Sequence, residues 1–250
     1  MPHLTIGLKT IAYEVRASAR AKRLRLTVQP QGVEVVVPPR VSKDEVQRFV
    51  DSNRSWIYEK VEKYQSLMSS HDGPERLRDG VRIPFRGEPT PLTVVLAERV
   101  HPRVVEGDGF RLELPKHLPL DAHEDVIETA LTKHLKRQAK LDAEMAVERF
   151  GPPHGLEPTG LRIKDQKRLW GSCTYAGVIN LNWRLILAPV DVFDYVVVHE
   201  LCHLRHRHHQ PPFWHMVGDV MPDFECHRHW LKVHGHLLTL KRPNAGQFAP

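Results

Sequence analysis

The sequence predicts an α+β fold. Apolar residues alternate with period two in the N-terminal third, which indicates strands, and recur at helical spacing over about 121–150, which indicates a long helix. A third stretch, about 192–206, is apolar on most sides and contains two histidines four residues apart. The 250 residues are enough to bury a core without disulfides or metal.

The N-terminal stretch predicts a β-hairpin followed by a capped helix. Alternating apolar residues at 24–28 and 33–37 are separated by a short turn that contains glycine. Ser42 and Glu45 have the spacing of a capping box, in which each side chain accepts a backbone N–H of the other residue. The apolar residues that follow at helical spacing predict one helix over about 43–67.

The middle of the chain predicts a loop, two strands and a long helix. The stretch 69–80 is polar and contains glycine and proline, so we expect a loop. Strands are expected at 92–96 and 110–114, as an extension of the first sheet. Asp121 is placed to cap the helix, which is expected to end near Phe150 because Gly-Pro-Pro follows.

The C-terminal region predicts short strands before a buried helix. Strands at 161–163 and around 178–183 precede the helical run from about Val192 to His206, and a Pro-Pro pair at 211–212 prevents that helix from continuing. Two further helices are expected at about 213–220 and 224–238.

Two regions are therefore expected along the chain. The first, 1–120, is rich in strands and contains one helix, whereas the second, 121–250, holds the buried helix and its histidines. They form either two domains or one continuous domain. No internal repeat is evident in the sequence.

Histidine is the unusual component of the composition. Ten of the 17 histidines lie between His199 and His236, a clustering typical of metal-binding segments. The three cysteines are widely spaced, which argues against a disulfide framework and fits a reducing cytoplasm. No apolar run suits a signal peptide or a membrane helix, so we expect a cytoplasmic protein without a membrane partner. The net charge of +6 leaves nucleic acid or nucleotide binding open.

Residues 199–203 read HELCH, which is an HExxH motif. On a helix, residues four apart lie about 40° apart around the axis and about 6 Å along it, so His199 and His203 can bind one ion. Zinc accepts such imidazoles at about 2.0–2.1 Å, and Glu200 then reaches the zinc-activated water as its general base. Because burying unpaired polar groups is costly, a bound metal is expected rather than an unpaired histidine pair.

A catalytic zinc site needs a third protein ligand. On a continuous helix His206 would lie about 10.5 Å beyond His199, too far for easy ligation. His209 comes just before the two prolines, where the chain must turn, and its spacing from His199 matches the extended HExxHxxxxxH motif. We therefore predict one Zn²⁺ per chain, held by His199, His203 and His209. The competing histidines are His206, His208 and His215.

A long segment, residues 168–223, resembles the YgjP-like, SprT-related zinc metallopeptidase family. It reads RLWGSCTYAGVINLNWRLILAPVDVFDYVVVHELCHLRHRHHQPPFWHMVGDVMPD. In that family a WGSC element precedes an N-L-N-W-R strand, an HELxH helix, a histidine at the position of His209 and an FW pair, and all occur here. The family's Asn-His-Ser around the third ligand reads His208-His209-Gln210. Weaker similarity covers the N-terminal hairpin and helix.

The resemblance implies a zincin-like, minigluzincin catalytic domain, in which the HExxH helix packs on a small sheet and a cleft follows an edge strand. The strand over 178–184 is the expected edge because it is the last strand before that helix, and a peptide can pair with such an edge. Asn180, Asn182 and Arg184 alternate along it and are candidates for binding substrate or an oxyanion, although Arg184 alternatively holds a carboxylate. The WGSC element is expected to be a packing turn, with cleft lining as the alternative.

The expected function is hydrolysis of peptide bonds in a peptide or protein substrate, with Glu200 as general base. Two alternatives remain open. The same metal site can attack phosphorus, which would give a nucleoside triphosphate (UTP) pyrophosphatase, although the sequence has no Walker-type loop. Alternatively, zinc only organises the fold of a non-catalytic, nucleic-acid-associated protein.

Overall fold

The computed structural model describes residues 2–6, 9–19, 21–29, 32–69, 74 and 76–241. They form two compact units that divide between residues 75 and 76. Each unit has its own cluster of buried hydrophobic side chains. The division differs from the one expected near residue 120, because the strands between 82 and 115 belong to the second unit.

The first unit is a four-stranded sheet with two helices. The predicted hairpin is confirmed, since β3 and β4 pair antiparallel. Two strands that the sequence did not predict complete the sheet, in the order β1-β2-β4-β3, with β2 parallel to β4. The elements are β1 (His3–Ile6), β2 (Lys9–Ala17), β3 (Arg25–Gln29), β4 (Gly32–Val37), α1 (Lys43–Ser52) and α2 (Arg54–Ser69).

The helix expected over 43–67 begins as predicted but is interrupted. The Ser42–Glu45 capping box is present: the Glu45 N–H donates to Ser42 Oγ at 3.2 Å and the Ser42 N–H donates to Glu45 Oε2 at 2.8 Å. Asn53 ends α1, and its side-chain amide donates to the Phe49 carbonyl at 2.7 Å. An asparagine that hydrogen-bonds to the preceding turn competes with the helical backbone, which explains the break.

The second unit contains two sheets and the longest helix. Its N-terminal elements are β5 (Arg82–Phe85), β6 (Glu88–Ala97), β7 (Arg103–Glu106), β8 (Phe110–Pro115) and α3 (His123–Phe150). Its C-terminal elements are β9 (Gly160–Lys164), β10 (Gly171–Cys173), β11 (Val178–Asn182), α4 (Val190–Cys202), α5 (Pro211–Val220) and α6 (Phe224–His234). Asp121 does not cap α3, because it lies in a 3-10 turn over Leu120–Ala122 that precedes the helix.

The strands at 92–96 and 110–114 do not extend the first sheet, so that prediction was wrong. They lie in β6 and β8, which form a separate sheet of order β5-β6-β8-β7. The N-terminal sheet has the same arrangement, with a parallel pair between two antiparallel pairs. The buried pair Tyr13–Val33 corresponds to the buried pair Leu92–Phe110. The two sheets therefore share their pattern of strand pairing, although no internal repeat is evident in the sequence.

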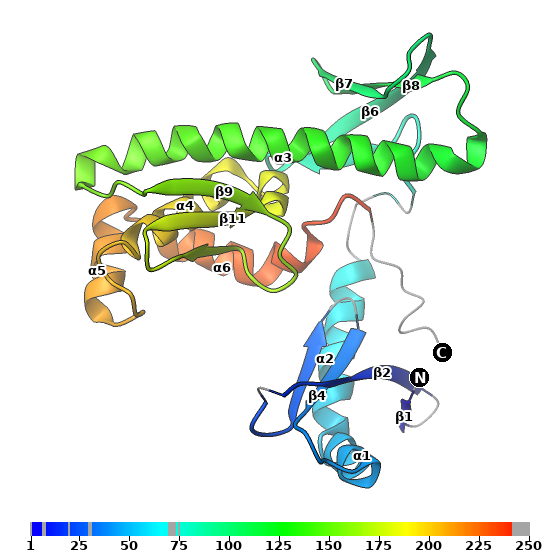
Figure 1. Ribbon diagram of the computed structural model, residues 1–250, viewed down its shortest axis with the longest axis vertical. Helices are drawn as coiled ribbons and strands as arrows, with labels where there is room; N and C mark the ends of the chain where they lie inside the picture. The colour runs from blue at the N-terminus through cyan, green and yellow to red at the C-terminus, as the bar shows by residue number, and fades with distance from the viewer. Residues whose placement is uncertain are drawn as a thin grey trace. The chain divides into compact units, whose positions relative to one another are not determined.

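Helix α3 connects the two sheets of the second unit. Its 28 residues span about 42 Å. It packs against β7 and β8 on one side of the unit and against β9 and α4 on the other (Figure 1). The ion pair between Arg86 and Asp142, with Nη2 and Oδ1 2.7 Å apart, fixes the β5–β6 turn to this helix.

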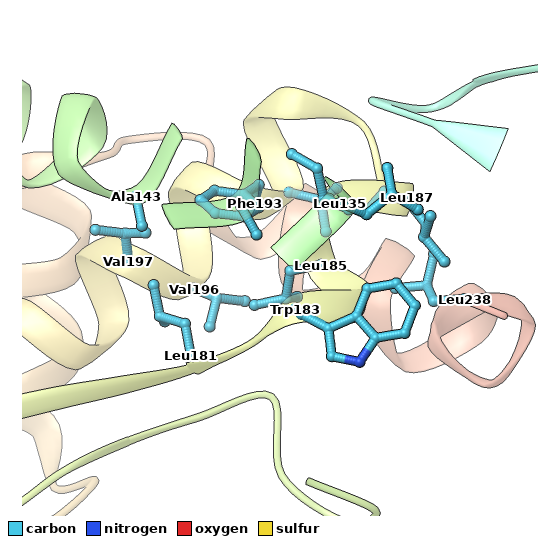
Figure 2. Close-up of a cluster of buried hydrophobic side chains, with 14 of the residues drawn as sticks. Leu135, Ala143, Leu181, Trp183, Leu185, Leu187, Phe193, Val196, Val197 and Leu238 are labelled. Carbon is cyan, nitrogen blue, oxygen red and sulfur yellow. The ribbon is translucent and has the colours of Figure 1, made fainter. Parts of the chain in front are cut away.

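The third sheet has the strand order β10-β11-β9, and the core beneath it joins α3, β11 and α4. Leu135 and Ala143 of α3, Phe193 and Val197 of α4 and Leu181 of β11 belong to one buried cluster (Figure 2). Ten of the 13 residues of α4 are buried, which explains why the sequence of this helix is apolar on most sides. The packing leaves one edge of α4 for the polar residues of the HELCH motif.

Candidate metal centre

Helix α4 positions His199 and His203 on one face, four residues apart. Their rings stand edge to face, with centroids 4.9 Å apart. The helix ends at Cys202, with His203 as its C-terminal cap, rather than continuing to His206 as predicted. The early end matters because the chain can then turn back towards the two histidines.

The turn brings His209 to both helical histidines. His209 Nε2 lies 3.0 Å from His199 Nε2 and 3.1 Å from His203 Nε2. Among the described residues, these three form a cluster whose ligand atoms all lie within 4.8 Å of one another. Their convergence is the geometry that the sequence motif led us to expect.

Neighbouring groups hold the three rings in place. His203 Nδ1 lies 2.9 Å from the carbonyl oxygen of His206, so the other ring nitrogen faces the cluster. The His203 ring stacks on Phe213 with centroids 4.5 Å apart, and the His209 ring stacks on Trp214 at 5.6 Å. Helix α5 therefore supports the third histidine after Pro211 has begun that helix.

Burial controls the ionisation of the centre. It lowers the pKa of His199 to about 3, with smaller contributions from His203 and His209, and it also lowers the pKa of His203. Both imidazoles are therefore neutral near pH 7, which is the form that binds a metal. Burial raises the pKa of Glu200 to about 8. A nearby cation would lower the pKa of that carboxyl group, because it stabilises the carboxylate.

Glu200 is 4% exposed and packs against the backbone of β10. A Cβ atom added to Gly171 would lie 2.6 Å from Glu200 Oε1 and 2.7 Å from its Cγ, closer than real contacts allow. Glu200 Oε2 and His199 Nδ1 are buried with no hydrogen-bond partner among the described residues. A buried carboxylate oxygen without a partner is costly unless another group satisfies it.

The strand beside the centre is β10, not the strand that the sequence suggested. Strand β11, Val178–Asn182, is central in the third sheet, because it pairs antiparallel with β10 and parallel with β9. Strand β10, Gly171–Cys173, is an edge strand in the described part of the chain. The WGSC element therefore supplies an edge strand instead of a turn.

Asn180 and Asn182 lie under this edge and hydrogen-bond to it. The Asn180 side-chain amide donates to the Ser172 carbonyl at 3.4 Å. The Asn182 side-chain amide donates to the Leu169 carbonyl at 3.0 Å, and its backbone N–H donates to the Trp170 carbonyl at 2.8 Å. The structure thus places both asparagines behind β10, and neither lines the cleft at the histidines.

Arg184 does not join the other candidate site residues. Its Nη1 atom lies 2.5 Å from Asp165 Oδ1, and Lys136 Nζ lies 3.2 Å from the second oxygen of the same carboxylate. Burial raises the pKa of Asp165, but the pairing with Arg184 and Lys136 leaves it below the usual value. Arg184 therefore holds a carboxylate, which is the alternative role that the sequence left open for it.

A cleft of about 450 Å³ opens at the histidine cluster. It is lined by residues of β10 and α4, together with others that include Arg207 and Leu231. The WGSC element lines the cleft, which is the alternative that the sequence left open for it. Sequence reasoning did not single out Tyr195, Arg207 or Leu231 as site residues, although all three line the cleft. Tyr195 was detectable, because it lies four residues before His199 on the same helical face. The other two depend on contacts between distant segments.

Comparison with known proteins identifies the family. The sequence pattern described as the YgjP-like, metallopeptidase domain matches residues 22–234. The chain belongs to the YgjP-like metallopeptidase family. The match covers residues 22–75 of the N-terminal unit as well as most of the second unit.

One solved structure resembles part of this YgjP-like chain. A crystal structure described as the metallopeptidase zymogen of Pyrococcus abyssi abylysin is similar to part of it, with 23% identity and a TM-score of 0.33. The similarity covers 36% of this chain and 93% of that one. No curated protein sequence matches. Within the described residues, no helix is long and apolar enough to cross a membrane.

Proposed function

We propose that the protein is a zinc-dependent peptidase in which His199, His203 and His209 hold one zinc ion and Glu200 is the general base. The observation that carries the proposal is the convergence of three Nε2 atoms beside a buried carboxylate. Three histidines are a donor set that zinc accepts while it keeps an open position for catalysis. Membership of a metallopeptidase family supports a peptide or protein as substrate.

The residues fit such an ion. Nitrogens bound tetrahedrally to zinc at about 2.1 Å lie about 3.4 Å apart, close to the separations of 3.0 and 3.1 Å found here. Ring nitrogens this close to one another need a group between them, either a metal ion or a hydrogen-bonding proton. The unpartnered Glu200 oxygen at the same place also fits a site that receives a further group.

The arrangement of α4 beside β10, β11 and β9 supports a zincin-like, minigluzincin assignment for the second unit. When bound, zinc supplies Lewis acidity that polarises the scissile carbonyl and lowers the pKa of a water in the open position. Glu200 accepts the proton of the attacking water and passes it to the leaving amine. Burial and the Gly171 backbone keep the Glu200 carboxylate facing the cleft.

The backbone of β10 is suited to hold an extended substrate. Gly171, Ser172 and Cys173 line the cleft, and the strand has a neighbour, β11, on one side only within the described chain. A peptide that adds to this edge gains backbone hydrogen bonds irrespective of its sequence. In this proposal β10, rather than the segment 178–184 that the sequence suggested, is the edge strand with which a substrate peptide pairs.

The cleft favours a peptide over a nucleoside triphosphate. Arg207 is the single lysine or arginine that lines it in the described part of the chain. The guanidinium of Arg207 already donates to the Thr174 carbonyl at 2.8 Å and to the Tyr175 carbonyl at 3.1 Å. Phosphate chains are bound by several cations or by backbone N–H groups, so one engaged arginine is a poor match.

The role of Glu200 is tested with Glu200→Gln. The amide keeps the size of the side chain but cannot accept a proton, so kcat on casein should fall by about 10²–10⁴-fold. Zinc content, measured by elemental analysis, should stay at one ion per chain because the histidines are unchanged. Wild-type turnover in the variant would exclude Glu200 as the base. Hydrolysis of UTP but not casein by the zinc-loaded wild type would favour the pyrophosphatase alternative.

A further inference from the structure

The cleft has two chemically different ends, because β10 and the residues before it run beside α4. Gly171 lies against Glu200, as the 2.6 Å approach of its added Cβ shows, and Cys173 Sγ lies 3.7 Å from Arg207 Nη1. The residues that precede Gly171 therefore extend in the opposite direction, towards the first turns of α4. At the Arg207 end the lining is polar and basic.

The opposite end is apolar. It is formed by side chains from three separate segments: the residues before β10, helix α4 and helix α6. Glu200 marks the boundary, and beyond it this end has no charged lining residue within the described chain. The residues of this end are Leu169, Trp170, Tyr195, Val196 and Leu231, which we call the apolar end.

We propose that the apolar end binds a large apolar side chain of the peptide, next to the scissile bond, and so makes the enzyme selective for leucine-like or phenylalanine-like residues there. This inference rests on the proposed peptidase function and specifies its substrate class. A charged side chain in the same place would lose water, and no charged residue among those that line this end would pair with it, which is unfavourable. An apolar side chain would instead cover Leu169, which is 53% exposed.

The walls of the apolar end are held in place before substrate arrives. Two hydrogen bonds from Asn182 fix the backbone carbonyls of Leu169 and Trp170, at 3.0 and 2.8 Å. The Trp170 ring rests on Gly235, where an added Cβ would lie 2.9 Å from Trp170 Cζ2. Tyr195 and Val196 are 5% and 3% exposed, so the packing around them restricts the motion of their side chains. A preformed apolar pocket discriminates between side chains without first having to be ordered.

The selectivity is tested with zinc-loaded enzyme and fluorogenic peptides that vary one residue on either side of the cleaved bond. The wild type should cleave peptides with Leu, Phe or Met at one of these positions with a kcat/KM about 10-fold or more above those with Gly, Asp or Lys. If the peptides are cleaved with similar kcat/KM whatever residue they carry at these positions, the proposed selectivity is wrong, but the peptidase function is supported. Failure to cleave any peptide would overturn both.

Two variants locate the selectivity. Leu231→Lys should reduce the preference for apolar residues about 10-fold and improve cleavage next to Asp or Glu. Leu169→Lys, at an exposed position that tolerates charge, should shift the preference in the same direction if Leu231→Lys does not fold. The matched control is Met145→Lys on α3, where the side chain is 57% exposed and outside the cleft. An unchanged profile in a folded Leu169→Lys variant would contradict the proposal.

A binding measurement separates selectivity from turnover. The Glu200→Gln variant with zinc should bind a Leu-containing peptide about 10-fold more tightly than its Asp-containing counterpart in calorimetry. Leu231→Lys in that background should remove the difference. Equal affinities for both peptides in the Glu200→Gln variant would argue against the apolar end as a binding pocket.

Discussion

Glu200 and Gly171 show how one residue depends on another that lies 29 positions earlier in the chain. Nothing larger than a hydrogen fits between the Glu200 side chain and the Gly171 backbone. The glycine therefore sets where the carboxylate lies relative to the histidine cluster. Because a general base must lie within hydrogen-bond reach of its proton, a small displacement has a large kinetic effect.

Gly171→Ala should lower kcat on peptides by about 100-fold with little change in zinc content, because it displaces Glu200 and leaves the histidines in place. Strand β9 of the same sheet offers a matched control. An added Cβ at Gly160 meets Val178 at 3.6 Å, which is an ordinary contact, so Gly160→Ala should retain activity. Unfolding experiments add a second readout, since the loss of stability in Gly171→Ala should largely disappear when combined with Glu200→Ala. Equal losses in both backgrounds would show that Gly171 acts elsewhere.

His209 is the residue whose role most needs the tertiary structure. Its neighbours His206 and His208 are equally able to bind zinc in chemical terms, but His209 Nε2 is the one placed 3.0 Å from His199 Nε2. His209→Ala should weaken zinc binding by about 100-fold or more, measured by competition with a chelator. His208→Ala is the control, and its affinity should remain near that of the wild type. A larger effect in His208→Ala would reassign the third ligand.

At the scale of elements, the pairing of α3 with α4 determines how the HExxH helix is held. Arg149 of α3 and Asp194 of α4 form an ion pair, with Nη1 and Oδ2 2.9 Å apart. Burial raises the pKa of Asp194 from 3.8 to about 6, aided by Asp191 and Asp142 and opposed by Arg149 and His227. The folded protein therefore binds a proton at this site between about pH 4 and pH 6 that the unfolded chain does not bind.

This proton makes the folding stability depend on pH in a defined direction. The contribution of Asp194 is largest below about pH 4 and is lost as the pH rises through about 6, a change of about 3 kcal/mol. Asp194→Asn removes the titration, so its free energy of unfolding relative to the wild type should rise between pH 4 and pH 7. Urea unfolding at both pH values, with a chelator present so that metal release does not contribute, measures the difference. If the free energy of unfolding of Asp194→Asn relative to the wild type falls as the pH rises, the raised pKa of Asp194 is contradicted.

Prediction of elements succeeded where the signal was local. The Ser42–Glu45 box, the α3 periodicity and the prolines near α5 each act within a few residues, and the structure has a helix start or end near each. Four strands in the two four-stranded sheets, β1, β2, β5 and β7, were not predicted, because short strands with mixed polarity give weak patterns. Strand β10 has only three residues, which is too short for any periodicity.

At the scale of the whole molecule, the two buried clusters share no residue. One lies in the N-terminal unit and includes Ile57, which is 1% exposed. The other includes Leu135 of α3 and the residues behind the metal centre. Because each unit has its own core, we expect two unfolding transitions rather than one.

Calorimetry of the full chain tests this expectation. Ile57→Ala should destabilise the N-terminal unit by about 2–5 kcal/mol and lower the Tm of one transition by about 10 °C or more. Leu135→Ala should lower the other. Added zinc should raise only the transition that Leu135→Ala lowers, because a ligand stabilises the unit that binds it. A single transition that all three changes shift together would show that the two cores unfold as one.

The sequence by itself determined which residues are candidates for a metal centre, because the pattern that identifies them consists of short spacings. Two histidines four residues apart on a buried helix, a glutamate beside them and a histidine just before two prolines are local facts, and the family match agrees with what they imply. The tertiary structure decided the rest. It placed the strands of the first 120 residues in two separate sheets with the same pattern of pairing. It also made β10 rather than β11 the edge strand at the cleft, and it placed Gly171 against Glu200. Strand pairing and close approach join segments far apart in the chain, and a pattern of residue types along one segment does not determine its distant partner.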